Sequence, residues 1–101
     1  MRREAKVDKY YHIHISPRPG VTREQIESVL NRAIDWYRYD PKNWIVYTNS
    51  DAKTWYSRLQ SLVEPEGYTL ICKLDMSDRY GFMPKGTWEW IEGLKGKARG
   101  L

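Results

Sequence analysis

Residues 34–49 constrain the fold more than any other stretch of the chain, because they predict a β-hairpin enclosed between two helices. The segment reads Ile-Asp-Trp-Tyr-Arg-Tyr-Asp-Pro-Lys-Asn-Trp-Ile-Val-Tyr-Thr-Asn. Aromatic and β-branched residues favour strands, and the Asp-Pro-Lys-Asn sequence between them favours a turn. We therefore predict strands over Trp36–Tyr39 and Asn43–Asn49, joined by a tight turn.

One strand and one helix are expected before the hairpin. Side chains over Tyr10–Ser16 alternate with the period of a strand, and Pro17 ends it because proline cannot donate to a β-ladder. Thr22 and Gln25 have the spacing of a capping box, which predicts a helix from about Thr22 to Ala33. The apolar stripe of this helix consists of Ile26, Val29, Leu30, Ala33 and Ile34.

A second helix, a last strand and a short third helix are expected after the hairpin. The polar segment that ends at Asp51 caps the second helix. Side chains over Tyr68–Asp75 alternate with the period of a strand. Cys72 lies on the more apolar face of this predicted strand, so we expect it in the core. Pro84 suits the first turn of a helix. The apolar stripes are Ala52, Trp55, Tyr56, Leu59, Leu62 and Val63 in the second helix, and Trp88, Ile91 and Leu94 in the third.

This order of strand, helix, hairpin, helix and strand is typical of the ferredoxin-like sandwich. We therefore predict an α+β, ferredoxin-like βαββαβ sandwich with a short additional C-terminal helix. The 101 residues suit one domain. We place it at residues 10–94, between a flexible basic arm over 1–9 and a flexible basic tail over 95–101.

The formal net charge of +4 gives little support to nucleic-acid binding. Residues 1–9 hold four basic and two acidic side chains and residues 95–101 hold three basic ones, which leaves ten basic and eleven acidic residues between them. Nucleic-acid binders usually carry their positive charge on a folded face. Here the excess lies on the two predicted tails, which can still add nonspecific affinity.

Several classes of protein are disfavoured by the composition. The single cysteine, Cys72, allows no disulfide within the chain, and the N-terminus lacks the apolar segment of a signal peptide. No apolar run approaches the ~20 residues that span a bilayer. We expect a cytoplasmic protein with no membrane association, no cofactor and no resident metal.

The end of the domain carries a resemblance. Pro84–Ile91 has the form Pro-x-x-x-Trp-x-Trp-Ile and follows Gly81-Phe82-Met83. With Asn43-Trp44-Ile45-Val46 ahead of a polar cap and a helix, it resembles the SinR-like small proteins, which are related in fold to the small CRISPR-associated ferredoxin-like nuclease family. The resemblance covers residues 10–94. It implies a βαββαβ core with a C-terminal helix, a homodimer, and a role in phage, mobile-element or defence biology.

One departure from the nuclease family is important. In that family an aspartate closes the first strand and is the proposed metal-binding residue, whereas this chain has His14-Ile15-Ser16-Pro17 there. Phosphodiester hydrolysis with a bound metal needs hard oxygen ligands. The nuclease activity is therefore not carried over, and we predict no catalytic residue.

The two histidines, His12 and His14, share one face of the first strand. Two imidazoles about 7 Å apart along a strand could hold a transition metal with a third ligand, for which Asp75 or Asp78 is nearest in sequence. We favour the alternative that both rings line an interface. His14-Ile15-Ser16 also has the His-x-Ser form of two-histidine phosphoesterases, but the second motif they need is absent.

Aromatic residues on the strands offer a further candidate site. Tyr10 and His12 would lie beside Trp44 or Tyr47 if the first and third strands are central, which is how RNA-recognition domains stack bases. Aromatic residues also favour strands and dimer faces because they bury large areas. We favour the second explanation. Trp90 lies about 200° round its helix from Trp88, so one of the two is expected to meet the hairpin or a partner chain.

Together these observations predict a small, non-catalytic, homodimeric domain that binds a macromolecular partner, either protein or nucleic acid. The alternatives are a metal-dependent nuclease of the CRISPR-associated ferredoxin-like type, using His12, His14 and Asp75, and a single-stranded nucleic-acid binder. The candidate binding or interface residues are Tyr10, His12, His14, Trp44, Tyr47 and Trp90.

Overall fold

Over its described residues the chain forms an α+β structure with a four-stranded antiparallel sheet and three helices. The computed structural model describes residues 7–98. The elements are β1 (Lys9–Ser16), α1 (Arg23–Leu30), β2 (Asp35–Asp40), β3 (Asn43–Thr48), α2 (Ala52–Val63), β4 (Tyr68–Leu74) and α3 (Lys85–Ala98). The strand order is β2-β3-β1-β4, so β1 and β3 are central, and β2 and β4 are the edges. This order is compatible with a ferredoxin-like fold.

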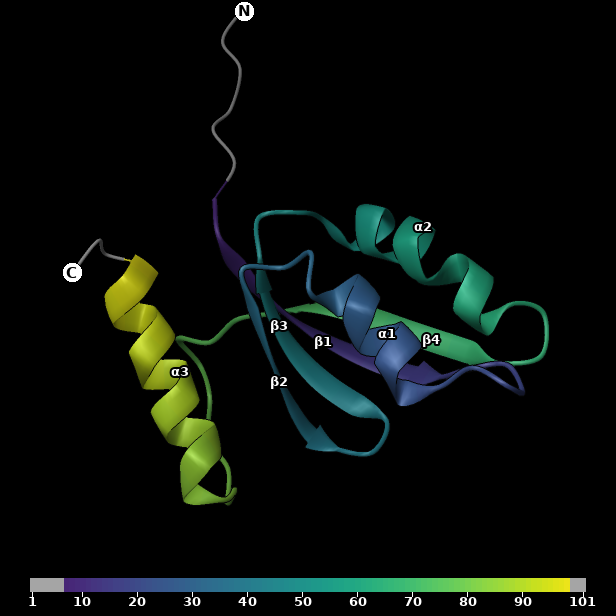
Figure 1. The fold of residues 1–101 in the computed structure, drawn as a ribbon. Helices are drawn as coiled ribbons and strands as arrows, with labels where there is room; N and C mark the ends of the chain where they lie inside the picture. Colours follow the sequence, from purple (N-terminus) through teal and green to yellow (C-terminus); the bar gives the residue numbers. More distant parts are fainter. Residues whose placement is uncertain (1–6, 99–101) are drawn as a thin grey trace, which may run out of the picture.

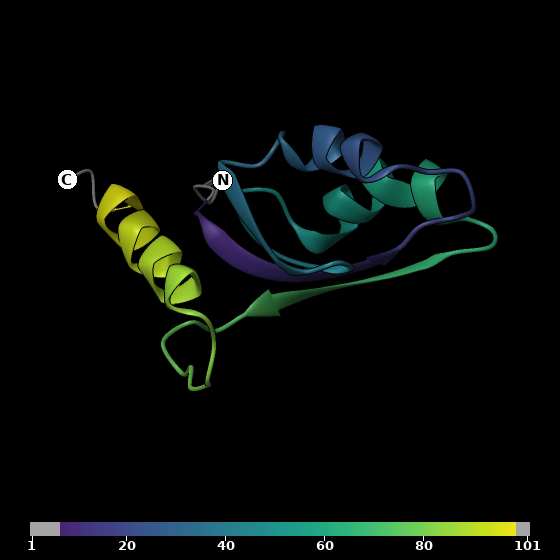
Figure 2. The same cartoon turned by 60° about the horizontal axis from the view of Figure 1, so that its bottom comes forward.

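The molecule is layered. Helices α1 and α2 lie on the same face of the sheet (Figure 1). Turned to show the sheet from its edge, the structure has both helices on one side, while α3 lies across one end of the strands (Figure 2). Within residues 7–98, the face opposite α1 and α2 therefore has no helical layer over most of its area (Figure 2).

Local chemistry explains the helix ends. The Thr22 hydroxyl accepts from the Gln25 amide at 3.2 Å, and the Gln25 side chain accepts from the Thr22 amide at 2.8 Å, which confirms the capping box. Helix α1 ends at Leu30, earlier than predicted, because the Ala33 amide bonds the Leu30 carbonyl in a tighter turn. Asp51 caps α2 by accepting from the Thr54 amide at 2.9 Å.

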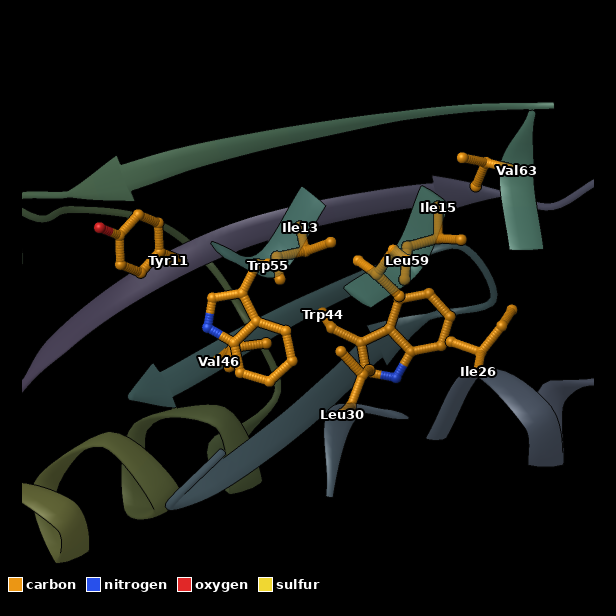
Figure 3. Close-up of a cluster of buried hydrophobic side chains, with 10 residues drawn as sticks. All are labelled: Tyr11, Ile13, Ile15, Ile26, Leu30, Trp44, Val46, Trp55, Leu59 and Val63. Atoms are coloured by element: carbon orange, nitrogen blue, oxygen red, sulfur yellow. The ribbon is translucent and has the colours of Figure 1, made fainter. Parts of the chain in front are cut away.

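The core lies between the sheet and the two covering helices (Figure 3). Two tryptophans, Trp44 from β3 and Trp55 from α2, are fully buried within it. The Trp55 indole N–H donates to the Thr48 hydroxyl at 3.2 Å, so its polar edge is satisfied inside the apolar cluster. The cluster consists of Tyr11, Ile13, Ile15, Ile26, Leu30, Trp44, Val46, Trp55, Leu59 and Val63.

Gly67, the residue directly before β4, lies in a very narrow space. A Cβ atom there would lie 2.2 Å from the Ser16 carbonyl oxygen and 2.7 Å from the Pro17 carbonyl carbon. Both neighbours are backbone atoms, which cannot rotate away as a side chain can. Glycine at this position lets β4 enter the sheet directly beside the end of β1.

Residues 1–6 and 99–101 lie outside the described residues, and most of the predicted arm and part of the predicted tail fall there. Lys9 already belongs to β1, and α3 continues to Ala98, beyond the predicted domain end at residue 94. Between residues 7 and 98, no helix has the length and apolar character needed to cross a membrane.

Candidate functional site on the open face of the sheet

We call the side of the sheet opposite α1 and α2 the open face. The strand registers place four β1 residues on it, and the direct cross-strand partners of those residues lie on it too. Its members are Tyr10, His12, His14 and Ser16 from β1, Asp35 and Tyr37 from β2, Asn43, Ile45 and Tyr47 from β3, and Tyr68, Leu70, Cys72 and Leu74 from β4. Tyr39 lies at the irregularity of β2 and joins them through its contact with His12.

Helix α3 covers one corner of the open face through four aromatic rings, Tyr10, Tyr37, Tyr47 and Trp90, which we call the aromatic corner. The Tyr10 and Tyr47 rings lie 4.9 Å apart, and Trp90 stacks on Tyr37 at 5.6 Å. The Trp90 indole N–H donates to the Asp35 carboxylate at 3.2 Å. Trp90 therefore meets the hairpin, one of the two alternatives that its helical position allowed.

A continuous chain of hydrogen bonds runs across the open face from Ser16 to Asp40, and we call it the histidine chain. His14 Nε2 lies 3.0 Å from the Ser16 hydroxyl, and His14 Nδ1 lies 2.9 Å from Asn43 Oδ1. The Asn43 amide nitrogen lies 2.8 Å and 2.9 Å from the two Asp40 carboxylate oxygens. The hydrogen bonds that Asp40 accepts from the Lys42 amide and from Asn43 hold the pKa of its carboxyl below the usual value.

The chain fixes the proton on His14. Asp40 can only accept, so the Asn43 amide nitrogen must face it and the Asn43 oxygen must face His14. His14 Nδ1 then carries the proton, and in the neutral ring Nε2 accepts from Ser16. A serine hydroxyl bonded to a histidine base is also the arrangement of a nucleophile. Ser16, however, is only 7% exposed, so its hydroxyl offers a substrate little access.

The second histidine has a different environment. His12 Nε2 lies 2.6 Å from the Tyr39 hydroxyl, and the two rings are 5.6 Å apart. Burial lowers the pKa of His12, and the nearby His14 lowers it further, while Asp40 opposes both effects. Its imidazole is therefore favoured in the neutral form.

The described residues contain no group of three His, Cys, Asp or Glu side chains that could hold a metal ion. The ring nitrogens of His14 face Asn43 and Ser16, and the Asp75 carboxylate accepts from the amide and hydroxyl of Ser77. The predicted alternative of His12, His14 and Asp75 as one ligand set is thus not assembled in this structure.

Beyond the aromatic corner, the open face keeps an uncovered area that we call the exposed strip. Tyr68 and Leu70 of β4 are 65% and 62% exposed, and Tyr68 stacks on His14 at 5.5 Å between ring centres. The strip contains no lysine, arginine or carboxylate. Its members are His12, His14, Tyr39, Tyr68, Leu70 and Cys72.

Two predictions about single residues are wrong. Trp44 was a candidate interface residue, but it lies on the helix-covered face with no exposed surface. Alternation along β3 separates it from Tyr47, so only one of the two could belong to the open face. Cys72 was expected in the core, but it is exposed, because the more apolar side of β4 faces away from the helices.

Three members of the site were missed from the sequence: Ser16 as a partner of His14, Asn43 and Asp40. The Asp-Pro-Lys-Asn turn held the signal, since Asp40 and Asn43 flank it. Only the register that sets His14 opposite Asn43 connects this turn to β1. The other candidates, Tyr10, His12, His14, Tyr47 and Trp90, lie on the open face or against it.

Comparisons with known proteins give no further guide to the site. No protein-family model matches the chain, and searches of curated proteins and of solved structures found no match.

Proposed function

We propose that this chain is a small, non-catalytic, homodimeric ferredoxin-like domain that binds a partner protein through the exposed strip. One observation carries the proposal: β4 turns its more apolar side away from the core. Its covered side holds Thr69, Ile71 and Lys73, whereas its open side holds Tyr68, Leu70, Cys72 and Leu74. Exposed apolar side chains gathered on one surface are typical of an interaction site.

The charge of the strip favours protein over nucleic acid. Tyr39 and Tyr68 could stack on bases, which keeps a single-stranded nucleic-acid binder as the second candidate. Affinity for nucleic acid, however, comes largely from cations that contact phosphates. The strip has two imidazoles as its basic groups, and burial lowers the pKa of His12, which favours the neutral form of that ring.

Resemblance to the SinR-like small proteins agrees with this proposal. It rests on the Pro84–Ile91 ending and on the Asn43–Val46 strand, and it implies a homodimer with the same order of elements. Trp90, which belongs to that ending, attaches α3 to the sheet through Tyr37 and Asp35. The nuclease alternative receives no support from the geometry of the described residues.

A peptide-display selection against the purified protein tests the proposal. We expect enriched peptides to bind the wild type and to lose binding at least tenfold to Tyr68→Asp, which adds a charge to the strip (about 1.4 kcal/mol per tenfold). Tyr56→Asp is the matched control, because Tyr56 is 38% exposed on α2, away from the open face. Tight binding of single-stranded RNA at moderate salt, lost in Tyr68→Ala, would instead establish the second candidate.

A further inference from the structure

The two edges of the sheet are protected very differently. Edge strand β2 is irregular between Arg38 and Asp40, and α3 packs against it through Trp90. Edge strand β4 pairs with β1 over seven residues in unbroken register and contains no proline. Bulges, prolines and covering helices are the usual means of blocking an edge strand. In the part of the chain that the structure describes, β4 is hydrogen-bonded to β1 alone and forms one edge of the sheet.

The direction of the free backbone groups on β4 follows from one hydrogen bond. The Ile15 amide donates to the Lys42 carbonyl at 2.9 Å. The backbone amides and carbonyls of the odd-numbered residues of β1 therefore point toward β3. In an antiparallel sheet the backbone groups of successive residues point to opposite sides. The even-numbered residues of β1 therefore bond to β4, through Tyr68, Leu70, Cys72 and Leu74. Three residues remain with their amides and carbonyls pointing outward: Thr69, Ile71 and Lys73.

We infer that β4 pairs antiparallel with β4 of a second copy of this chain, about a twofold axis at Ile71. Thr69 then faces Lys73 of the second copy, and the outward amides and carbonyls of all three residues are used. A register centred on Cys72 would set Thr69 opposite Asp75, which lies outside β4. The Ile71 register is the one that satisfies the whole edge.

The side chains also fit a second copy. On the open face this register sets Leu70 opposite Cys72 and Tyr68 opposite Leu74, so apolar groups meet apolar groups. Lys73 is the one charged residue in β4, and the twofold axis sets it opposite Thr69 instead of another lysine. Like charges directly opposite each other would destabilise the pair. The inference rests on the homodimer in the proposed function and names the surface that forms it.

A designed cross-link tests the register. In the proposed dimer residues 70 and 72 form a non-hydrogen-bonded pair, with Cα atoms about 4.5 Å apart, within the range that a disulfide requires. Leu70→Cys should therefore give a covalent dimer under mild oxidation. The wild type should not, because its two Cys72 residues would be diagonal neighbours about 7–8 Å apart. Tyr68→Cys is the matched control and should also stay uncross-linked, since it faces Leu74.

Lys73→Pro tests the backbone pairing. It removes an outward amide that β1 does not use, so the monomer should keep its fold, while the dimer loses the bonds to Thr69 on both sides of the axis. Light scattering should give twice the 12.1 kDa monomer mass for the wild type and for Lys73→Ala, and the monomer mass for Lys73→Pro. Circular dichroism of Lys73→Pro verifies that the monomer is folded.

The outcomes separate this inference from the proposed function. A wild-type dimer that survives Lys73→Pro and does not cross-link in Leu70→Cys would overturn the β4 pairing and leave the homodimer standing. Cross-linking of the wild type through Cys72 alone would overturn the Ile71 register. A monomeric wild type that still binds selected peptides would refute both the pairing and the homodimer, while the binding role of the exposed strip would stand.

Discussion

The covered face and the open face of the sheet are built from alternate residues of the same strands, yet they are held together by different forces. On the covered face Ile13, Ile15 and Val46 have no exposed surface and pack against α1 and α2. On the open face, His14 and its neighbours form hydrogen bonds and ring contacts instead. Burial of apolar area dominates folding stability, whereas a hydrogen bond that replaces a bond to water contributes far less.

This difference implies a division of roles. The covered face should carry most of the stability, and the open face should tolerate change unless a substitution breaks the aromatic corner or the histidine chain. Substitutions of matched chemistry on the two faces can separate the contributions, and the expected effects fall in a clear order.

The largest difference in stability is expected between alanine substitutions of two leucines, one on each face. Leu59 is fully buried under the helices and Leu70 is 62% exposed on the open face. Leu59→Ala should lower the free energy of unfolding by about 2–5 kcal/mol, because it leaves a cavity. Leu70→Ala should change it by less than about 0.5 kcal/mol. Urea unfolding in the Lys73→Pro background measures both without a contribution from dimerisation. Equal losses would mean that the open face is packed as tightly as the core.

The next effect concerns the aromatic corner. Trp90→Ala removes the stack on Tyr37, the edge contact with Tyr10 at 6.2 Å and the bond to Asp35. We expect a loss of about 1–3 kcal/mol, less than for a fully buried tryptophan. Trp90→Phe keeps an aromatic ring and should retain more than half of the stabilisation that Trp90→Ala loses. If limited proteolysis between β4 and α3 is not faster in Trp90→Ala than in the wild type, Trp90 is not what holds α3.

A smaller effect is expected from the histidine chain. Asn43→Ala removes the group that fixes the proton on His14 Nδ1, at a cost of about 1 kcal/mol. Nitrogen-15 chemical shifts of the imidazole should show Nδ1 protonated in the wild type and a mixture of tautomers in the variant. His12 is an internal control, because Asn43 is not among its hydrogen-bond partners. A wild-type His14 protonated on Nε2 would contradict the assigned chain.

The smallest effect is a pH dependence from His12. Burial lowers its pKa in the folded state from the ordinary 6.5, so the unfolded chain binds more protons in the window below that value. The free energy of unfolding should therefore fall as the pH drops through about 6.5, and level off once the folded-state imidazole is also protonated. His12→Gln should show a shallower decrease over the same window. Identical slopes would show that His12 does not contribute.

The order of elements could be predicted because local signals mark each boundary. The capping box at Thr22 and Gln25, the cap at Asp51 and the turn between Asp40 and Asn43 act within a few residues of chain. The helix end was the least accurate part: residues up to Ala33 continue the apolar spacing, yet α1 stops at Leu30. Periodicity does not distinguish a helical turn from the tighter turn that follows.

The candidate site could be predicted only in part, because it depends on contacts between distant segments. Alternation showed that Trp44 and Tyr47 point to opposite faces, but not which face the helices cover. Hydropathy was misleading for β4, where the more apolar side, with Leu70 and Cys72, is the open one. The partnership of His14 with Asn43, 29 residues away, needs the sheet register, which no local signal supplies.

Gly67 also affects the open face, because the missing side chain there lets β4 lie at its observed distance from β1. Even a methyl group would collide with the Ser16 carbonyl and force the two backbones apart. The stacked ring of the next residue, Tyr68, would move with its strand and leave the imidazole beneath it open to water. The absence of a side chain at this one position therefore determines how closely β4 approaches β1, and with it the shape of the exposed strip.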